Sequence, residues 1–105
     1  MRVENIAGLA FMDAHKRLVY WLLAATRGGP TRVKILKSLD KKPLNMRQLS
    51  LNLNLDYKTV QGHIKILTQH SILDTEGNKY GAIYFISPEW LDNNYLNEFI
   101  RGNEQ

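Results

Sequence analysis

The chain has 105 residues, 44% of them hydrophobic, a net charge of +4 at pH 7 and no cysteine. This length suits one domain, because a second core would have too little surface to bury. The lack of cysteine excludes disulfides, zinc-thiolate sites and thiol nucleophiles. The longest apolar run, Leu18 to Ala25, is much shorter than the roughly 20 residues that cross a bilayer. We therefore expect residues 1–105 to form a single soluble cytoplasmic domain without a membrane partner.

The positive charge is concentrated in the middle of the chain. Residues 27–65 carry nine basic and two acidic side chains, a sum of +7, whereas residues 1–26 sum to +1 and residues 66–105 to −4. A basic middle indicates a surface that faces a polyanion. A solvated lysine-rich face would produce the same pattern, so charge alone leaves both interpretations open.

The N-terminal segment, residues 8–27, is predicted to contain one long helix from Leu9 to Thr26. The apolar residues of this helix form two neighbouring stripes along its surface, and between Leu18 and Ala25 the helix is apolar almost all round. A surface helix of a monomer needs only one such stripe. We therefore expect the second stripe to form part of a homodimer interface.

Two shorter helices should follow. The segment Gly28-Gly29-Pro30 predicts the end of the first helix and the start of a second, from Arg32 to Leu39. After a polar break, Asn45 and Gln48 have the spacing of a capping box. They predict a third helix that ends near Leu53.

A fourth helix is predicted directly after a tight turn. Asn54 tolerates a left-handed backbone and suits the turn. Asp56 is a good N-cap for a helix from Tyr57 to His70. Its apolar residues recur at spacings of three and four, which predicts one buried face.

The rest of the chain should contain two strands and a last helix. Residues 72–75 and 80–86 have strand composition and are separated by a turn around Gly77. Ser87-Pro88-Glu89 is a strong helix start, so a single C-terminal helix is predicted over residues 87–101. The expected order is four helices, two strands and one helix.

One set of residues around the predicted turn, along the fourth helix and at the start of the first strand carries a family pattern: Leu49, Leu53, Leu55, Thr59, Val60, His63, Ile64, Leu67, Ile72 and Leu73. In these residues the segment from Leu44 to Leu73 resembles the winged helix-turn-helix of the ArsR family of regulators, and the resemblance extends over roughly residues 30–86. The resemblance implies a mainly α fold with a small β-hairpin wing, flanked by N- and C-terminal helices. It also implies a dimeric transcription regulator that places the fourth helix in the major groove of double-stranded DNA. Asn54 and Ser71 depart from the family, which usually has glycine there.

The face of the fourth helix opposite its apolar side carries side chains suited to DNA. Gln61 can bond adenine through two atoms, Thr59 can contact a thymine methyl, and Lys65 can reach guanine or phosphate. Gly62 costs about 1 kcal/mol relative to alanine in a helix; it either lets the backbone approach DNA or is simply tolerated. The predicted DNA contacts are Arg32, Arg47, Tyr57, Lys58, Thr59, Gln61, Gly62, Lys65 and Lys79.

Several basic residues are expected on phosphate. Arg32 and Arg47 each lie at a predicted helix start, where free amide groups also favour anions. Lys79 lies in the predicted wing turn, which suits the minor groove or its flanking phosphates. Lys41 and Lys42 could equally be a solubilising loop. A solvated helix face would look similar in isolation, but the turn and the basic middle of the chain favour DNA.

The homodimer interface is expected on the first helix together with the last. The predicted interface residues are Leu18, Trp21, Leu22, Ala25, Tyr95 and Phe99. Trp21 and Trp90 are large enough to anchor this contact, but each could equally be part of the core. The sequence does not indicate an effector.

We expect no metal, no cofactor and no catalysis. His63 should pack against its own helix and bond to nearby backbone, and His15 and His70 belong to separate helices. The cysteine-based sensor site of metal-responsive relatives would fall on the third helix, which has no cysteine. The sequence shows no phosphate loop, nucleophile motif or acid–base pair.

Two other functions fit the fold. A winged-helix module that binds protein would favour an uncharged or acidic fourth helix, whereas this one carries Lys58 and Lys65. An RNA-binding or architectural chromatin role is compatible with the basic charge. However, single-strand binding would favour a platform of stacked aromatic rings, and Tyr57 stands alone in the basic segment.

Overall fold

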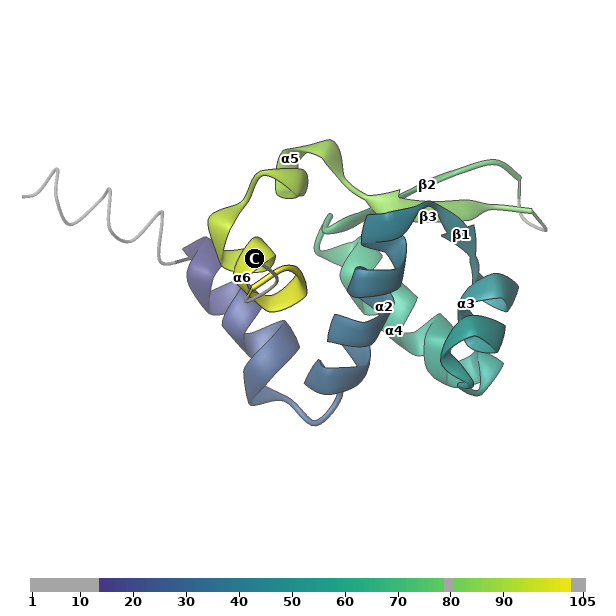
Figure 1. Cartoon of the computed structure of the whole chain (residues 1–105), viewed down its shortest axis with the longest axis horizontal. Coiled ribbons are helices and arrows are strands. Elements are labelled where there is room, and N and C mark those ends of the chain that lie inside the picture. Colours follow the sequence, from purple (N-terminus) through teal and green to yellow (C-terminus); the bar gives the residue numbers. More distant parts are fainter. Residues whose placement is uncertain (1–13, 79–80, 103–105) are drawn as a thin grey trace, which may run out of the picture.

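The computed structural model describes residues 14–78 and 81–102. Residues 14–20 are α-helical and continue into a π-helical turn, η1 (Trp21–Ala25). The later elements are α2 (Gly29–Lys41), β1 (Leu44–Asn45), α3 (Met46–Leu53), α4 (Tyr57–Gln69), β2 (Leu73–Glu76), β3 (Ile83–Ile86), α5 (Pro88–Leu91) and α6 (Asn94–Ile100). The predicted fold class, mainly α with a small β wing, is confirmed (Figure 1).

Helix α2 lies at the centre of the fold. It contacts η1, α3, α6 and β3 (Figure 1). Its buried apolar residues Ile35, Leu36 and Leu39 join a single core to which nearly every element contributes. At the start of α2, a Cβ added to Gly29 would lie 2.5 Å from the Leu23 carbonyl oxygen. Glycine is therefore required where α2 meets the first helix.

The helix-turn-helix is built from local signals that the sequence predicts correctly. Asn45 caps α3, with Gln48 N–H donating to Asn45 Oδ1 and Asn45 N–H donating to Gln48 Oε1, both at 2.8 Å. Asn54 ends α3 in the left-handed conformation, with φ of 53°. Asp56 then caps α4 by accepting from the backbone N–H groups of Lys58 and Thr59. These bonds satisfy amide groups at each helix start that have no partner inside the helix.

The wing is a three-stranded antiparallel sheet in the order β1-β3-β2. The two strands predicted after α4 pair with each other, with Leu73 opposite Ile86. The third strand, β1, was not predicted, because two residues are too few to show a strand period. It pairs with β3 through Leu44 opposite Tyr84. Lys79, predicted at the wing turn, lies outside the described residues.

The C-terminal segment is not one helix, so that prediction is wrong. It forms α5 and α6, which are separated at Asp92 and Asn93. The Asn93 side chain accepts a hydrogen bond of 3.0 Å from the backbone N–H of Leu96 and so begins a new helix. A short polar side chain competes in this way with continued helical pairing. The break allows Trp90 and Leu96 both to reach the core.

The N-terminal helix also differs from the prediction. Its last described turn is π-helical, and the part of residues 8–27 before residue 14 lies outside the described residues. Among the residues that the structure describes, none of the helices combines the length and apolar character needed to cross a bilayer.

Candidate nucleic-acid interface

The outer face of α4 is a row of exposed polar side chains. Val60, Ile64 and Leu67 turn the opposite face of the helix into the core. The exposed residues are Tyr57, Lys58, Thr59, Gln61, Gly62 and Lys65. All six residues that the sequence singles out on this helix are therefore accessible. Arg47, at the start of α3, is exposed as well.

An open groove runs beside this row. It has a volume of about 490 Å³ and is lined by Gln61 and Lys65 of α4, Met46 of α3 and Tyr84 of β3, among others. The groove lies between the helix-turn-helix and the sheet. It lets a ligand that contacts Gln61 and Lys65 extend towards the wing.

Gly62 lies on the open side of α4. A Cβ built at this position meets no heavy atom within 4 Å. Packing within the chain therefore does not require glycine here.

Arg32 does not belong to this surface, and its prediction as a phosphate contact is wrong. Only 4% of the residue is exposed. Its Nε–H donates to the Leu22 carbonyl oxygen at 2.8 Å, Nη2 donates to Thr26 Oγ1, and Nη1 lies 3.1 Å from His63 Nδ1. Burial lowers the pKa of Arg32. Its position three and four residues before Ile35 and Leu36 is the signal that could have placed it on the inner face of α2.

His63 is packed, as expected, but its partner is a side chain of another helix. The ring faces Arg32 of α2 and is half-buried. Burial, and secondly the charge of Arg32, lower the pKa of His63. Within residues 14–78 and 81–102, no three metal-ligating side chains gather into a possible metal site.

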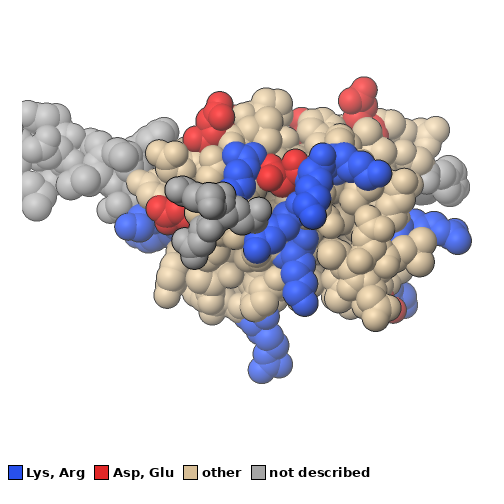
Figure 2. Space-filling view, in the orientation of Figure 1, with Lys and Arg blue, Asp and Glu red and all other residues tan. Residues whose placement is uncertain are grey.

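A large part of the positive charge lies away from α4. Figure 2 shows basic side chains gathered over α2 on the face in view. Lys34, Lys37 and Lys41 are exposed at spacings of three and four along that helix. Close by, Arg101 Nη2 forms a salt bridge of 2.6 Å with Asp40. The basic middle of the chain is therefore divided between α2 and the helix-turn-helix.

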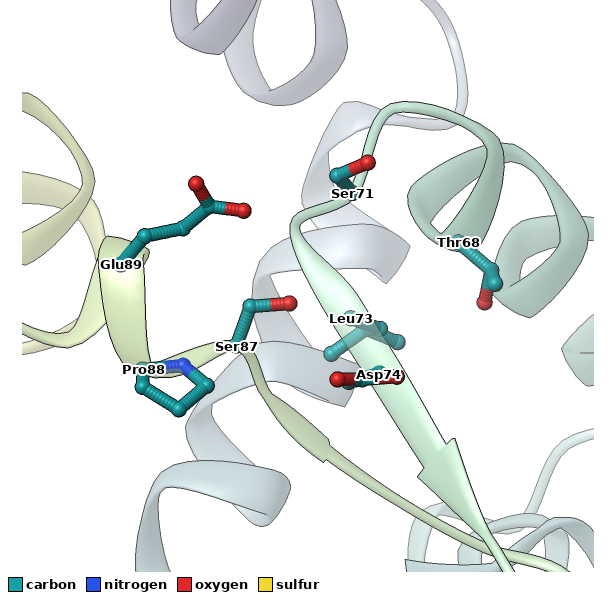
Figure 3. A pocket seen from close by; sticks show the side chains of 7 residues that line it. All are labelled: Thr68, Ser71, Leu73, Asp74, Ser87, Pro88 and Glu89. Atoms are coloured by element: carbon teal, nitrogen blue, oxygen red, sulfur yellow. The ribbon is translucent and has the colours of Figure 1, made fainter.

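A second hollow, of about 410 Å³, lies where α4 ends and α5 begins (Figure 3). Hydroxyl and carboxyl groups dominate its lining, which consists of Thr68, Ser71, Leu73, Asp74, Ser87, Pro88 and Glu89. The carboxylates of Asp74 and Glu89 repel phosphate. A DNA-binding surface on α4 should therefore end before this hollow.

An exposed apolar surface follows the first helix. Tyr20 is 60% exposed and Trp21 is 50% exposed. The centroid of the Trp21 ring lies 6.3 Å from the centroid of the His70 ring. Ala25 is exposed and Leu18 half-buried. A groove of about 280 Å³ next to Tyr20 is lined by Tyr95 and Phe99 of α6, together with the charged residues Lys16, Arg17 and Glu98.

Two side chains considered for the dimer interface belong to the core instead. Leu22 is completely buried within the single chain, so its prediction as an interface residue is wrong. Trp90 is also a core residue. Val19 and Leu23 of the first helix also face the core, whereas Tyr20 and Trp21 are exposed.

A helix-turn-helix followed by a β-hairpin that packs beside it defines the winged helix-turn-helix class, whose members place one exposed helix in the DNA major groove. Residues 29–74 match the family model described as bacterial regulatory protein, arsR family. The chain therefore has a winged helix-turn-helix fold, and over this segment it is similar to the ArsR family of bacterial regulatory proteins.

Solved structures share this fold at low sequence identity. Reduced HlyU from Vibrio cholerae N16961 is 20% identical, with a TM-score of 0.63 over 88% of each chain. The transcriptional regulator HlyU from Vibrio vulnificus CMCP6 is 18% identical, with a TM-score of 0.65 over 92% of each chain. The transcriptional repressor BigR from Xylella fastidiosa is 13% identical, with a TM-score of 0.64 over 93% of this chain and 86% of that one. No curated protein sequence matches the chain.

Proposed function

We propose that this chain regulates transcription as a homodimer that binds double-stranded DNA sequence-specifically. The observation that carries the proposal is the row of exposed polar side chains on α4, held by a capped helix-turn-helix. The core fixes the opposite face of α4, so this row can enter a major groove without rearrangement of the fold.

The exposed residues divide into two roles. Thr59, Gln61 and Lys65 have side chains that can read base edges. Arg47, Lys58 and the Tyr57 hydroxyl suit phosphate, and phosphate contacts fix the register of the protein on DNA. Lys79, which the sequence predicts in the wing turn and which lies outside the described residues, completes the proposed set. Arg32 is omitted because it is buried.

The proposed homodimer uses the exposed stripe of the first helix and the groove beside α6. Tyr20, Trp21 and Ala25 would supply the first helix, with Leu18 at its edge, and Tyr95 and Phe99 would supply α6. Exposed aromatic side chains of this size are typical anchors of protein interfaces. A two-fold dimer would favour a symmetric DNA site with half-sites about one helical turn apart.

Selection of bound fragments from random DNA tests the proposal, followed by binding assays with two variants. Gln61→Ala should weaken binding to the selected site by about 1–3 kcal/mol and relax the preference at one base position. Arg47→Ala should weaken binding to selected and random DNA alike and reduce the salt slope by about one unit.

The matched control is Lys37→Ala, which removes an exposed positive charge from α2 and not from the helix-turn-helix. It should leave the base preference unchanged and affect affinity less than Arg47→Ala. If selection yields no preferred site and neither α4 nor α3 variants alter binding, a protein-interaction module becomes the better account.

A substitution of Gly62 separates its two interpretations. Gly62→Ala should stabilise the fold by up to about 1 kcal/mol, because alanine favours the helix and the added methyl meets open space. If the α4 backbone approaches DNA closely here, the same variant should bind DNA several-fold more weakly. Thermal unfolding and DNA titration of the one variant measure both effects. A more stable variant with unchanged affinity would show that glycine is merely tolerated.

A further inference from the structure

Arg32 joins three helical parts of the molecule through one guanidinium group. Nε–H donates to the carbonyl oxygen of Leu22 and Nη2 to Thr26 Oγ1, both at the C-terminal end of the first helix. Nη1 reaches His63, in the middle of α4 between Gln61 and Lys65. The helix carrying the proposed dimer surface is thus connected to the helix carrying the proposed DNA surface. The unpaired carbonyl groups of a helix C-terminus favour a positive charge at this place.

The contact determines where the proton of His63 lies. An arginine guanidinium has only donors, so His63 Nδ1 must accept with a free lone pair. The neutral ring therefore carries its proton on Nε2. A second proton could bind only at Nδ1, where it would remove the hydrogen bond and place two positive charges about 3 Å apart.

The packing around the pair is tight. A Cβ added to Gly28, in the loop before α2, would lie 2.7 Å from both Arg32 Nη1 and His63 Cε1. The guanidinium and the ring therefore fill the space against this loop. A repelled ring therefore has no room to move towards this loop.

The charged groups around His63 favour its neutral form. Burial and the charge of Arg32 both lower its pKa below the usual 6.5. Besides α2, α4 packs mainly against α3 and β2, and the His70 ring at its end contacts the ring of Trp21 in η1. The charged side chains of α3 and β2, Arg47, Asp74 and Glu76, are exposed and do not act on the His63 ring.

We propose that the Arg32–His63 hydrogen bond positions α4 relative to the first helix, and that protonation of His63 releases it and weakens DNA binding. The inference rests on the proposed function. In a dimer built on the first helix, the orientation of α4 against that helix sets the geometry of the two recognition helices. A protonated molecule must lose the proton and restore the bond before it can bind DNA.

The sign of the effect follows from linkage. The unfolded chain binds a proton at His63 near pH 6.5, and the folded chain only at lower pH. The folded state is therefore most stable above pH 6.5 and loses stability as the pH falls below it. DNA affinity should follow the same direction, with up to a tenfold loss for each pH unit below the pKa of His63 in the free protein, until it levels off at the weaker affinity of the protonated form.

Binding assays between pH 7.5 and 5.0 with two His63 variants test the proposal. His63→Gln keeps an acceptor for Arg32 but cannot be protonated. It should bind as the wild type does at pH 7.5 and lose the acid-dependent fall. His63→Leu has no acceptor. It should bind weakly at every pH, near the level that the wild type reaches in acid.

The matched control is His70→Gln, at the exposed end of the same helix, which should keep the acid-dependent fall. Circular dichroism at each pH verifies that every variant is folded. The proposal is overturned if His63→Gln retains the wild-type pH dependence or if wild-type affinity rises in acid.

A measurement without DNA separates this proposal from the proposed function. Nitrogen NMR of the His63 ring should show the Nε2–H tautomer at pH 7.5 and a pKa below 6.5. A protonated Nδ1 at pH 7.5 would overturn the hydrogen bond. If the ring behaves as expected but the wild type binds no DNA at any pH, the proposed function fails and the bond remains as a structural link.

Discussion

Trp21→Glu should convert the proposed homodimer into a monomer. The Trp21 side chain is half exposed beside Tyr20, on the part of the first helix that faces away from the core. A carboxylate buried in an apolar interface without a partner costs several kcal/mol. A penalty of about 3 kcal/mol would raise the dimer dissociation constant roughly a hundredfold. Light scattering over a micromolar concentration series measures the change.

The matched control for this substitution is Leu51→Glu. Leu51 is 71% exposed on α3, on the opposite side of the molecule from the first helix (Figure 1). Its substitution makes the same apolar-to-acidic change there. It should leave the dimer intact. A wild-type protein that is monomeric throughout the series, or an equal effect of both variants, would contradict the proposed interface.

Arg32→Ala should be among the most damaging single substitutions. It removes the donor that Arg32 provides to the buried Leu22 carbonyl oxygen and removes the partner of His63. It also removes the packed aliphatic stem of the arginine. A hydrogen bond to a charged group contributes about 1.5–3 kcal/mol, so loss of the bonds to Leu22 and His63 should lower the free energy of unfolding by roughly 3–6 kcal/mol. Urea denaturation measures this difference.

Lys34→Ala provides the comparison on the same helix. Lys34 is exposed, so its removal should change the free energy of unfolding by less than about 0.5 kcal/mol. A surface arginine that only contacts phosphate would behave like Lys34. Similar stability of the two variants would therefore contradict the buried role of Arg32.

The helix-turn-helix was predictable because its signals act over short distances along the chain. The Asn45–Gln48 capping box, the left-handed Asn54 and the Asp56 cap each satisfy backbone groups within three residues. The buried face of α4 follows from apolar spacing alone. Local propensity and the final fold therefore agree in this segment.

The proposed DNA surface was predictable only in part, because a sequence shows which residues are charged but not on which face of the molecule they lie. Lys34 and Lys37 belong to the same basic segment as Lys58 and Lys65, yet they lie on α2 and not on α4. For α4, the apolar residues on its inner face indicate which side remains free. For Arg32, the charge suggested an exposed side chain, and only the packed helices reveal its buried partners.

The sequence by itself determined the winged helix-turn-helix class, the caps and turn of its two helices, and the polar face of α4. The tertiary structure alone decided that Arg32 is internal and that Leu44 adds a third strand opposite Tyr84. The physical reason is the distance along the chain between interacting groups. Arg32 and His63 are 31 residues apart, and a buried charge is tolerated only where folding brings its partners together.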